Sequence, residues 1–205
     1  MKFLFLYPPV EYFGIGGKLI FDTYAPPLGI LYLSTILEKE GHTIEVIDYG
    51  AQNIDYNQLA WAINSADAVG MTVLTPSFEN SIKLANLVKE IDSEIQLIIG
   101  GPHCFLFPEK ALLDMNADVS VEGDAELIIN DIVKALEGSK SFLEIPGVHY
   151  RDKKEIKKGP SPEIINDLDS ILFPARHLPL LIFPQALAPP QANQSQCERI
   201  VVLVP

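Results

Sequence analysis

The sequence predicts an α/β fold, a doubly wound, Rossmann-like parallel sheet of about five strands with helices on both faces. Short apolar runs alternate five times with segments of helical periodicity. Each segment between two runs is long enough to cross over and return as a parallel strand. Small and polar residues follow the runs, where the loops at the carboxyl edge of such a sheet lie. We expect the flavodoxin-like strand order 2-1-3-4-5.

The first strand is expected at residues 2–7, a continuously apolar run that is ended by two prolines. A glycine-rich loop follows. From Leu28 onward, apolar residues recur on one helical face, and Gly41 is a suitable C-terminal stop for this helix. The second strand is expected at residues 43–48.

Three further strands and four further helices continue the same alternation. The strands are expected at 68–74, 95–99 and 118–121, and the helices at 56–64, 78–91, 108–115 and 124–137. Ser77 is expected to cap the helix that begins at Phe78. Acidic residues open the last helix, where the helix dipole favours negative charge.

After Gly138 the pattern changes, and we expect three parts in all. Residues 1–138 would form the α/β domain. Residues 139–179 would hold a hairpin at 147–157, with its turn at Asp152-Lys153-Lys154, and an extended connector. Residues 180–205 have no usable periodicity, which suggests a truncated or frame-shifted tail.

Composition narrows the function classes. The chain has 205 residues and a formal net charge of -12, which disfavours non-specific binding to nucleic-acid phosphates. Its two cysteines form neither a disulfide framework nor a zinc site, so a reducing cytoplasm is the expected compartment. No apolar run reaches the roughly 18 residues of a membrane span.

In an open parallel sheet, ligands bind outside the carboxyl ends of the strands. The residues there include Gly14 and Gly16, Asp48, Thr75 and Ser77, Gly100 to His103, and Glu122 to Glu126. The pair Gly100-Gly101 would let a flat ligand approach the backbone, because neither residue carries a Cβ. Hydroxyls such as that of Thr72 could bond its polar atoms. Neither a dinucleotide fingerprint nor a Walker-type loop is present.

Four segments carry a resemblance to a known family. They read PPLGILYLSTILEKEGHTIEVID, VGMTVLTPSFENSIKLANLVKE, IIGGPHCFLFPE and ADVSVEGDAE. In order and spacing, the chain from residue 1 to about 179 resembles the cobalamin-binding domain that precedes many radical S-adenosylmethionine enzymes. The nearest branch is the magnesium-protoporphyrin IX monomethyl ester cyclase type.

The resemblance implies a corrinoid cofactor whose nucleotide tail enters a slot at the strand ends. Carried over by position, the slot would be lined by Thr72, Thr75, Ser77, Gly100, Gly101, Pro102, Glu122 and Gly123. The corrin face would meet the loops near Gly14, Gly16 and Asp48. The chain would then be the cobalamin-binding module of a methyltransferase or cyclase, with the catalytic radical domain as its partner.

Two departures from the family matter. The chain has no Asp-x-His-x-x-Gly motif, so no histidine ligand to cobalt is expected. It also lacks the Cys-x3-Cys-x2-Cys motif that holds a four-iron cluster. The iron-sulfur cluster and S-adenosylmethionine are therefore expected only in a missing domain, and catalysis by this chain alone is not expected.

Simpler readings stand beside each candidate residue. The glycine pair can serve a tight turn, Asp48 a turn, Ser77 a helix cap, and Glu122 and Glu126 a solvated helix start, while Cys104 is expected to be a buried thiol. At the level of function, the alternative is a scaffold that keeps the fold without a cofactor and packs on a catalytic domain. A response-regulator domain is disfavoured because Pro8-Pro9 and Leu74-Thr75 occupy its acidic positions.

Overall fold

The computed structural model describes residues 1–10, 26–49, 52, 54–153 and 155–178. Their strands form one seven-stranded sheet in the order β2-β1-β3-β4-β5-β6-β7. The first five strands are parallel, and β6 and β7 continue the sheet in antiparallel pairing. The predicted α/β fold class and the order 2-1-3-4-5 are thus confirmed.

The strands lie close to their predicted positions. They are β1 (Lys2–Tyr7), β2 (Thr43–Asp48), β3 (Ala68–Thr72), β4 (Gln96–Gly100), β5 (Val119–Val121), β6 (Val148–Asp152) and β7 (Glu155–Lys158). The third strand ends two residues earlier than expected and the fourth one residue later. In consequence Gly100 is the last residue of β4, paired with Thr72 of β3.

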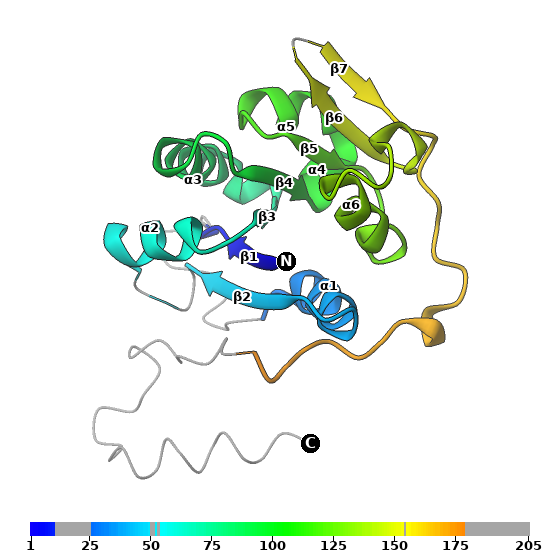
Figure 1. Cartoon of the computed structure of the whole chain (residues 1–205), viewed down its shortest axis with the longest axis horizontal. Helices are drawn as coiled ribbons and strands as arrows, with labels where there is room; N and C mark the ends of the chain where they lie inside the picture. Colours follow the sequence, from blue (N-terminus) through cyan, green and yellow to red (C-terminus); the bar gives the residue numbers. More distant parts are fainter. Residues whose placement is uncertain (11–25, 50–51, 53, 154, 179–205) are drawn as a thin grey trace, which may run out of the picture.

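Helices cover both faces of the sheet. They are α1 (Leu28–Lys39), α2 (Tyr56–Asn64), α3 (Phe78–Ile91), α4 (Pro102–Leu106), α5 (Pro108–Asp114) and α6 (Ile129–Leu136). Short 3-10 turns lie at Thr75–Ser77, Ala125–Leu127, Phe142–Glu144 and Leu168–Ser170. Figure 1 shows α1 and α6 on one side of the sheet and α2 and α3 on the other.

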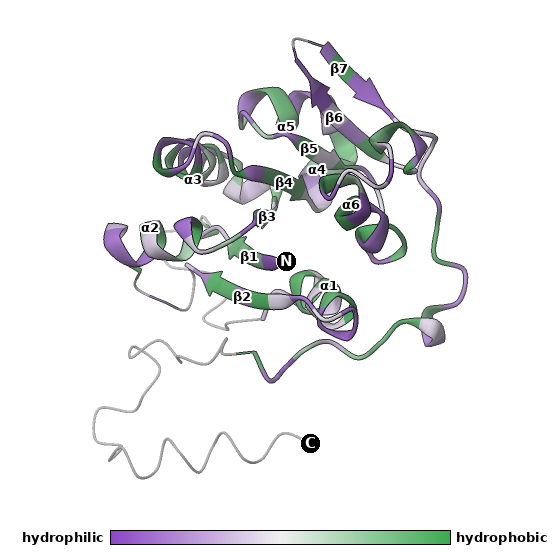
Figure 2. Cartoon of the chain, viewed as in Figure 1, coloured by the Kyte–Doolittle hydropathy of each residue, from purple (hydrophilic) through white to green (hydrophobic). Residues whose placement is uncertain are grey.

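Side chains along each strand alternate between the two faces of the sheet, and this divides the hydrophobic core into two clusters. Phe3 and Phe5 of β1 belong to a cluster packed against α1 and α6. Leu4 and Leu6, on the opposite face of the same strand, pack with α2, α3 and α5. Figure 2 shows the central strands as hydrophobic and the β6–β7 hairpin as largely hydrophilic. This is the burial pattern that parallel strands covered on both faces require.

The helices differ from expectation in three respects. The predicted helix at 124–137 is split into a 3-10 turn and α6, and α4 was not predicted at all. Ser77 does occupy the N-cap position of α3, but its hydroxyl donates to the carbonyl of Leu74 at 3.1 Å and caps no amide of α3. Asp55 does cap α2, accepting from the amide of Gln58 at 2.9 Å.

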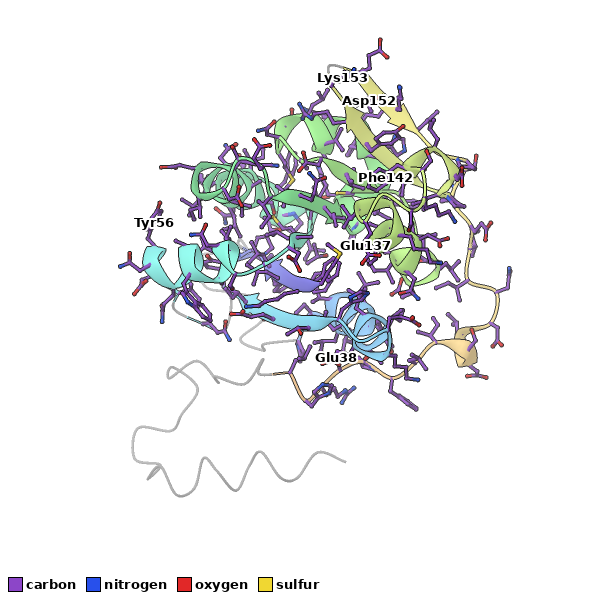
Figure 3. All side chains as sticks on the ribbon, in the orientation of Figure 1. Glu38, Tyr56, Glu137, Phe142, Asp152 and Lys153 are labelled. Carbon is purple, nitrogen blue, oxygen red and sulfur yellow. The ribbon has the colours of Figure 1, made fainter. Side chains whose placement is uncertain are left out.

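Backbone hydrogen bonds attach the hairpin and the connector to the α/β core at two separate places. Glycine at 147 donates its amide to the carbonyl of Pro160 (2.8 Å), and its carbonyl accepts from the amide of Glu122 (2.7 Å). Farther along, the amide of Ala175 donates to the carbonyl of Leu31 in α1 (3.0 Å). Figure 3 shows the turn residues Asp152 and Lys153 at the outer tip of the hairpin.

Gly147→Ala is expected to destabilise the chain strongly. Gly147 has φ +70°, and an added Cβ would lie 2.2 Å from the carbonyl oxygen of Glu122. Gly138→Ala is the matched control, because Gly138 has φ +77° but open space around the added atom. We expect the free energy of unfolding to fall by roughly 2 kcal/mol more in the Gly147 variant than in the control, because the control carries only backbone strain. Urea unfolding followed by circular dichroism measures both; equal losses would contradict the packing argument.

A cavity at the carboxyl ends of the central strands

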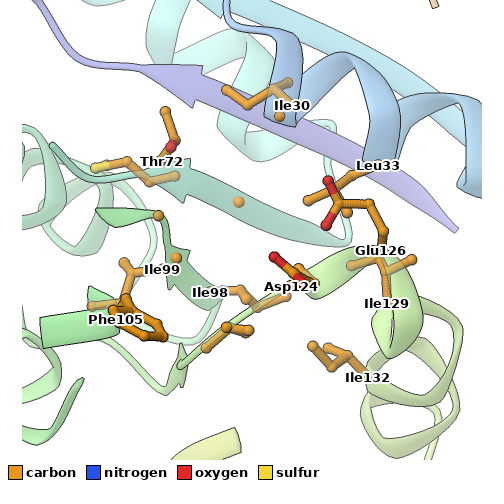
Figure 4. Close-up of a pocket in the computed structure, with 18 of the residues that line it drawn as sticks. Ile30, Leu33, Thr72, Ile98, Ile99, Phe105, Asp124, Glu126, Ile129 and Ile132 are labelled. Carbon is orange, nitrogen blue, oxygen red and sulfur yellow. The ribbon is translucent and has the colours of Figure 1, made fainter. Parts of the chain in front are cut away.

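A cavity of about 610 Å³ opens over β3 and β4 between α1 and α6. This volume lies within the range of about 300–1,000 Å³ that is usual for small-molecule sites. Its walls come from β1, β3, β4, β5, α1, α4, α6, the loop after β5 and the connector. Figure 4 shows Ile30 and Leu33 of α1 facing Ile129 and Ile132 of α6 across it.

The hollow exists because β3 presents small residues on one face. Ala68, Gly70 and Thr72 alternate with larger residues that join the opposite core. At Gly70 an added Cβ would lie 2.5 Å from the ring of Phe5, so this ring lies directly over the glycine. A side chain at position 70 would force the Phe5 ring to move.

The two glycines after β4 have separate physical roles. Gly100 faces open space, since an added Cβ would meet nothing closer than Val121 at 3.7 Å. Gly101 has φ +100°, and an added Cβ would lie 2.8 Å from the Thr72 hydroxyl. Gly101 therefore makes the turn into α4, and Gly100 leaves the cavity floor open. Both line the cavity, together with Pro102.

The connector closes one side of the cavity. Pro162, Glu163 and Ile164 line it. Gly123 has φ +98° and packs so closely on Pro162 that an added Cβ would lie 3.0 Å from it. The carboxylate of Asp124 accepts a hydrogen bond from the amide of Ile165 at 3.4 Å. The loop after β5 and the connector thus form one continuous wall.

The charged residues of the cavity are all acidic. Asp124, Glu126 and Glu163 line it, and no lysine, arginine or histidine does so among the described residues. Burial raises the pKa of Glu126, and the nearby Asp124 carboxylate adds to this effect. The site is therefore suited to an apolar ligand with neutral or cationic polar groups rather than to a polyphosphate.

The structure places the sequence-predicted residues in three groups. Thr72, Gly100, Gly101, Pro102 and Gly123 line the cavity. Asp48, Thr75, Ser77 and Glu122 do not line it. Gly14 and Gly16 lie outside the described residues.

The four residues away from the cavity have partners of their own or are buried elsewhere. Asp48 is fully buried at the end of β2, and the hydroxyl of Ser77 is bonded to the Leu74 carbonyl. Thr75 lies 3.2 Å from Nδ1 of His103. Glu122 lies 3.0 Å from Nε2 of His149.

The thiol and the imidazole near the glycine turn are buried. The ring of His103 stacks on Phe78 at a centroid distance of 3.9 Å, and burial lowers its pKa. Burial raises the pKa of the Cys104 thiol to about 12, so this residue is no nucleophile at neutral pH. This fits the expected buried thiol. Among the described residues, no group of three or more histidine, cysteine, aspartate or glutamate side chains is placed to hold a metal ion.

Sequence reasoning missed most of the apolar wall. Phe5, Gly70 and Ile98 form the floor, and Ile30 and Ile129 face each other across it. The signal for the floor is present in the sequence AVGMTV, where small residues fill every second position. The paired helix faces carry no comparable signal, because apolar helix residues are also expected in any core.

The sequence of the chain matches the model of a known protein family. Residues 20–133, more than half of the 205-residue chain, match the B12 binding domain. The chain belongs to the B12-binding domain family. The predicted resemblance is thereby confirmed, and cobalamin is the cofactor of this domain.

Three curated proteins are similar in sequence. The uncharacterized methyltransferase PH0819 of Pyrococcus horikoshii is 29% identical over 181 residues, which cover 87% of this chain and 39% of that protein. Cytidylyl-2-hydroxyethylphosphonate methyltransferase of Streptomyces wedmorensis is 26% identical, covering 74% and 36%. Anaerobic magnesium-protoporphyrin IX monomethyl ester cyclase of Rubrivivax gelatinosus is 26% identical, covering 83% and 32%. The chain thus spans less than two fifths of the length of these relatives.

Solved structures share the fold at lower sequence identity. The radical S-adenosylmethionine methyltransferase TsrM of Kitasatospora setae, with cobalamin and a [4Fe-4S] cluster bound, gives a TM-score of 0.66 at 17% identity and covers 84% of this chain and 31% of that one. The cobalamin-dependent radical enzyme OxsB with aqua-cobalamin bound gives 0.66 at 19% identity, covering 85% and 24%. In the described part of this chain, no helix is long and apolar enough to cross a membrane.

Glu126→Gln is expected to stabilise the ligand-free chain at alkaline pH. Because burial raises the pKa of Glu126, the native state holds this proton to a higher pH than the unfolded state does. The stabilisation that the bound proton of Glu126 gives to the native state is complete below the ordinary glutamate pKa. It is lost as pH rises through the raised pKa. The variant should therefore have the higher urea midpoint at about pH 8, with a difference that vanishes near pH 4.

The control for this measurement is Glu137→Gln, at an exposed position just after α6. A gain of the same size and pH dependence in the control variant would show that burial in the cavity is not the cause.

Proposed function

We propose that this chain binds a corrinoid with the nucleotide tail of the cofactor in the cavity between α1 and α6. The observation that carries the proposal is the open, mostly apolar hollow lined by Gly70, Thr72 and Gly100. The hollow lies at the carboxyl ends of parallel strands, where doubly wound sheets take their ligands. The family membership supplies the class of ligand.

The residues around the cavity fit the tail of a corrinoid. A flat heterocycle needs close access to backbone and an apolar surface on each side. Gly100 gives access to the backbone, and the side chains of Ile98 and Phe5 supply apolar surface at the floor of the cavity. Phe105 of α4, which is 56% exposed, offers further apolar surface at the mouth. The bound cofactor would supply methyl-transfer or redox chemistry at cobalt, and this chain would hold and orient it.

The alternative of a scaffold without a cofactor predicts bulky side chains in the space beside Gly100. That space is open, and the nearest described atom to an added Cβ is 3.7 Å away. This favours the binding proposal over the scaffold.

We further propose that the chain works as part of a larger radical enzyme. The relatives are methyltransferases and a cyclase of which this chain spans less than two fifths. The radical domain would supply the iron-sulfur cluster and the S-adenosylmethionine site, and the reaction of the whole protein would be methyl transfer or ring formation. A cytoplasmic location fits the reducing conditions that such a cluster needs.

Gly100→Leu is expected to weaken corrinoid binding strongly while the chain stays folded. The leucine side chain would occupy the open floor, whereas Gly100→Ala adds one methyl group at ordinary contact distance. The 205-residue chain is mixed with hydroxocobalamin, desalted, and examined by its visible absorbance. We expect retention by the wild type and the alanine variant, and an affinity at least roughly tenfold weaker in the leucine variant.

Asn64→Leu serves as the matched control, because this exposed position on α2 lies on the opposite face of the sheet. Colourless wild-type protein after desalting would contradict the proposed function. Equal binding by Gly100→Leu and the control would place the ligand somewhere other than this cavity.

A further inference from the structure

One acidic side chain reaches into the apolar part of the cavity. Glu126 follows β5 in the turn before α6 and is only partly exposed. Figure 4 shows its carboxyl group beside Leu33 of α1, directed into the cavity. Ile129 lies on the same wall. The carboxyl group therefore sits among aliphatic side chains rather than in open solvent.

The other two acids of the cavity differ from Glu126 in exposure. Asp124 is exposed, and its carboxylate accepts from the amide of Ile165. Glu163 is exposed on the connector. Glu126 has no lysine, arginine or histidine beside it on the cavity wall within the described residues. Burial accordingly raises its pKa.

A carboxyl group in such a place has a narrow set of favourable partners. When protonated, it donates a hydrogen bond to an unprotonated ring nitrogen; when ionised, it accepts one from a protonated ring nitrogen or an amide N–H. An anionic group placed directly against this carboxyl group is disfavoured by charge, and a purely hydrocarbon group offers it no additional hydrogen bond. A flat nitrogen heterocycle satisfies both the carboxyl group and the apolar walls.

We propose that Glu126 recognises the nitrogen heterocycle of the corrinoid tail by a hydrogen bond to its ring nitrogen. The inference rests on the proposed function and deepens it, because it assigns the polar contact that fixes the tail in the cavity. The proton is shared between carboxyl oxygen and ring nitrogen, so no other group has to supply charge. Glu126 is thus a residue that discriminates corrinoids with a heterocyclic tail from those without one.

The test compares two corrinoids that differ in the tail. Cobalamin carries a benzimidazole nucleotide, and cobinamide lacks it. Dissociation constants of both are measured by absorbance titration and calorimetry for the wild type, Glu126→Leu and Glu126→Gln. We expect Glu126→Leu to bind cobalamin roughly tenfold more weakly while its affinity for cobinamide is unchanged. Glu126→Gln keeps an N–H donor and should recover part of the loss.

Glu137→Leu is the matched control, because it removes an exposed acid just after α6 that does not line the cavity, and it should alter neither affinity. Thermal unfolding of each variant confirms that it is folded. Unchanged cobalamin affinity in Glu126→Leu, or an equal loss for both corrinoids, would overturn the inference while the proposed function stands. Failure of the wild type to bind either corrinoid would overturn the proposed function and this inference with it.

Discussion

The cavity depends on the pleat of one strand. Successive residues of β3 point to opposite faces of the sheet, so Ala68, Gly70 and Thr72 share one face, and Gly70 and Thr72 line the hollow. Their neighbours Val69 and Met71 fill the core beneath α3 and α5. The ring of Phe5 covers Gly70, and α1 and α6 rise on either side. Without small residues on that face, the helices would enclose an ordinary core with no space for a ligand.

Backbone geometry then frames this hollow at the strand ends. Gly101 and Gly123 both have positive φ, at +100° and +98°, and they turn the chain sharply after β4 and β5. The turn at Gly123 brings the loop against Pro162 of the connector. Because an added Cβ would lie 2.8 Å from the Thr72 hydroxyl at Gly101 and 3.0 Å from Pro162 at Gly123, the two glycines allow the neighbouring segments to approach closely. A wall of the cavity is therefore built from close contacts between parts of the chain that lie far apart in sequence.

Most of the fold could be predicted from sequence, and part of the site could not. Alternating apolar runs and helical segments determine the five parallel strands, since each run must be buried on both faces. Residues whose role follows from backbone freedom, such as Gly100 and Gly101, were likewise predictable. The polar candidates Thr75 and Glu122 do not line the cavity, because a position after a strand does not say which face a side chain takes. The connector wall depends on long-range packing, which leaves no local pattern.

The two faces of the sheet thus have different roles: one stabilises the fold and the other leaves space for a ligand. One face is filled by tightly packed side chains from α2, α3 and α5, and the other is left partly open. Changes to the open face can remove ligand affinity without dismantling the packed one. A domain built in this way can lose its cofactor and remain folded. It can also acquire a different ligand, because the packing of the other face does not depend on what occupies the cavity.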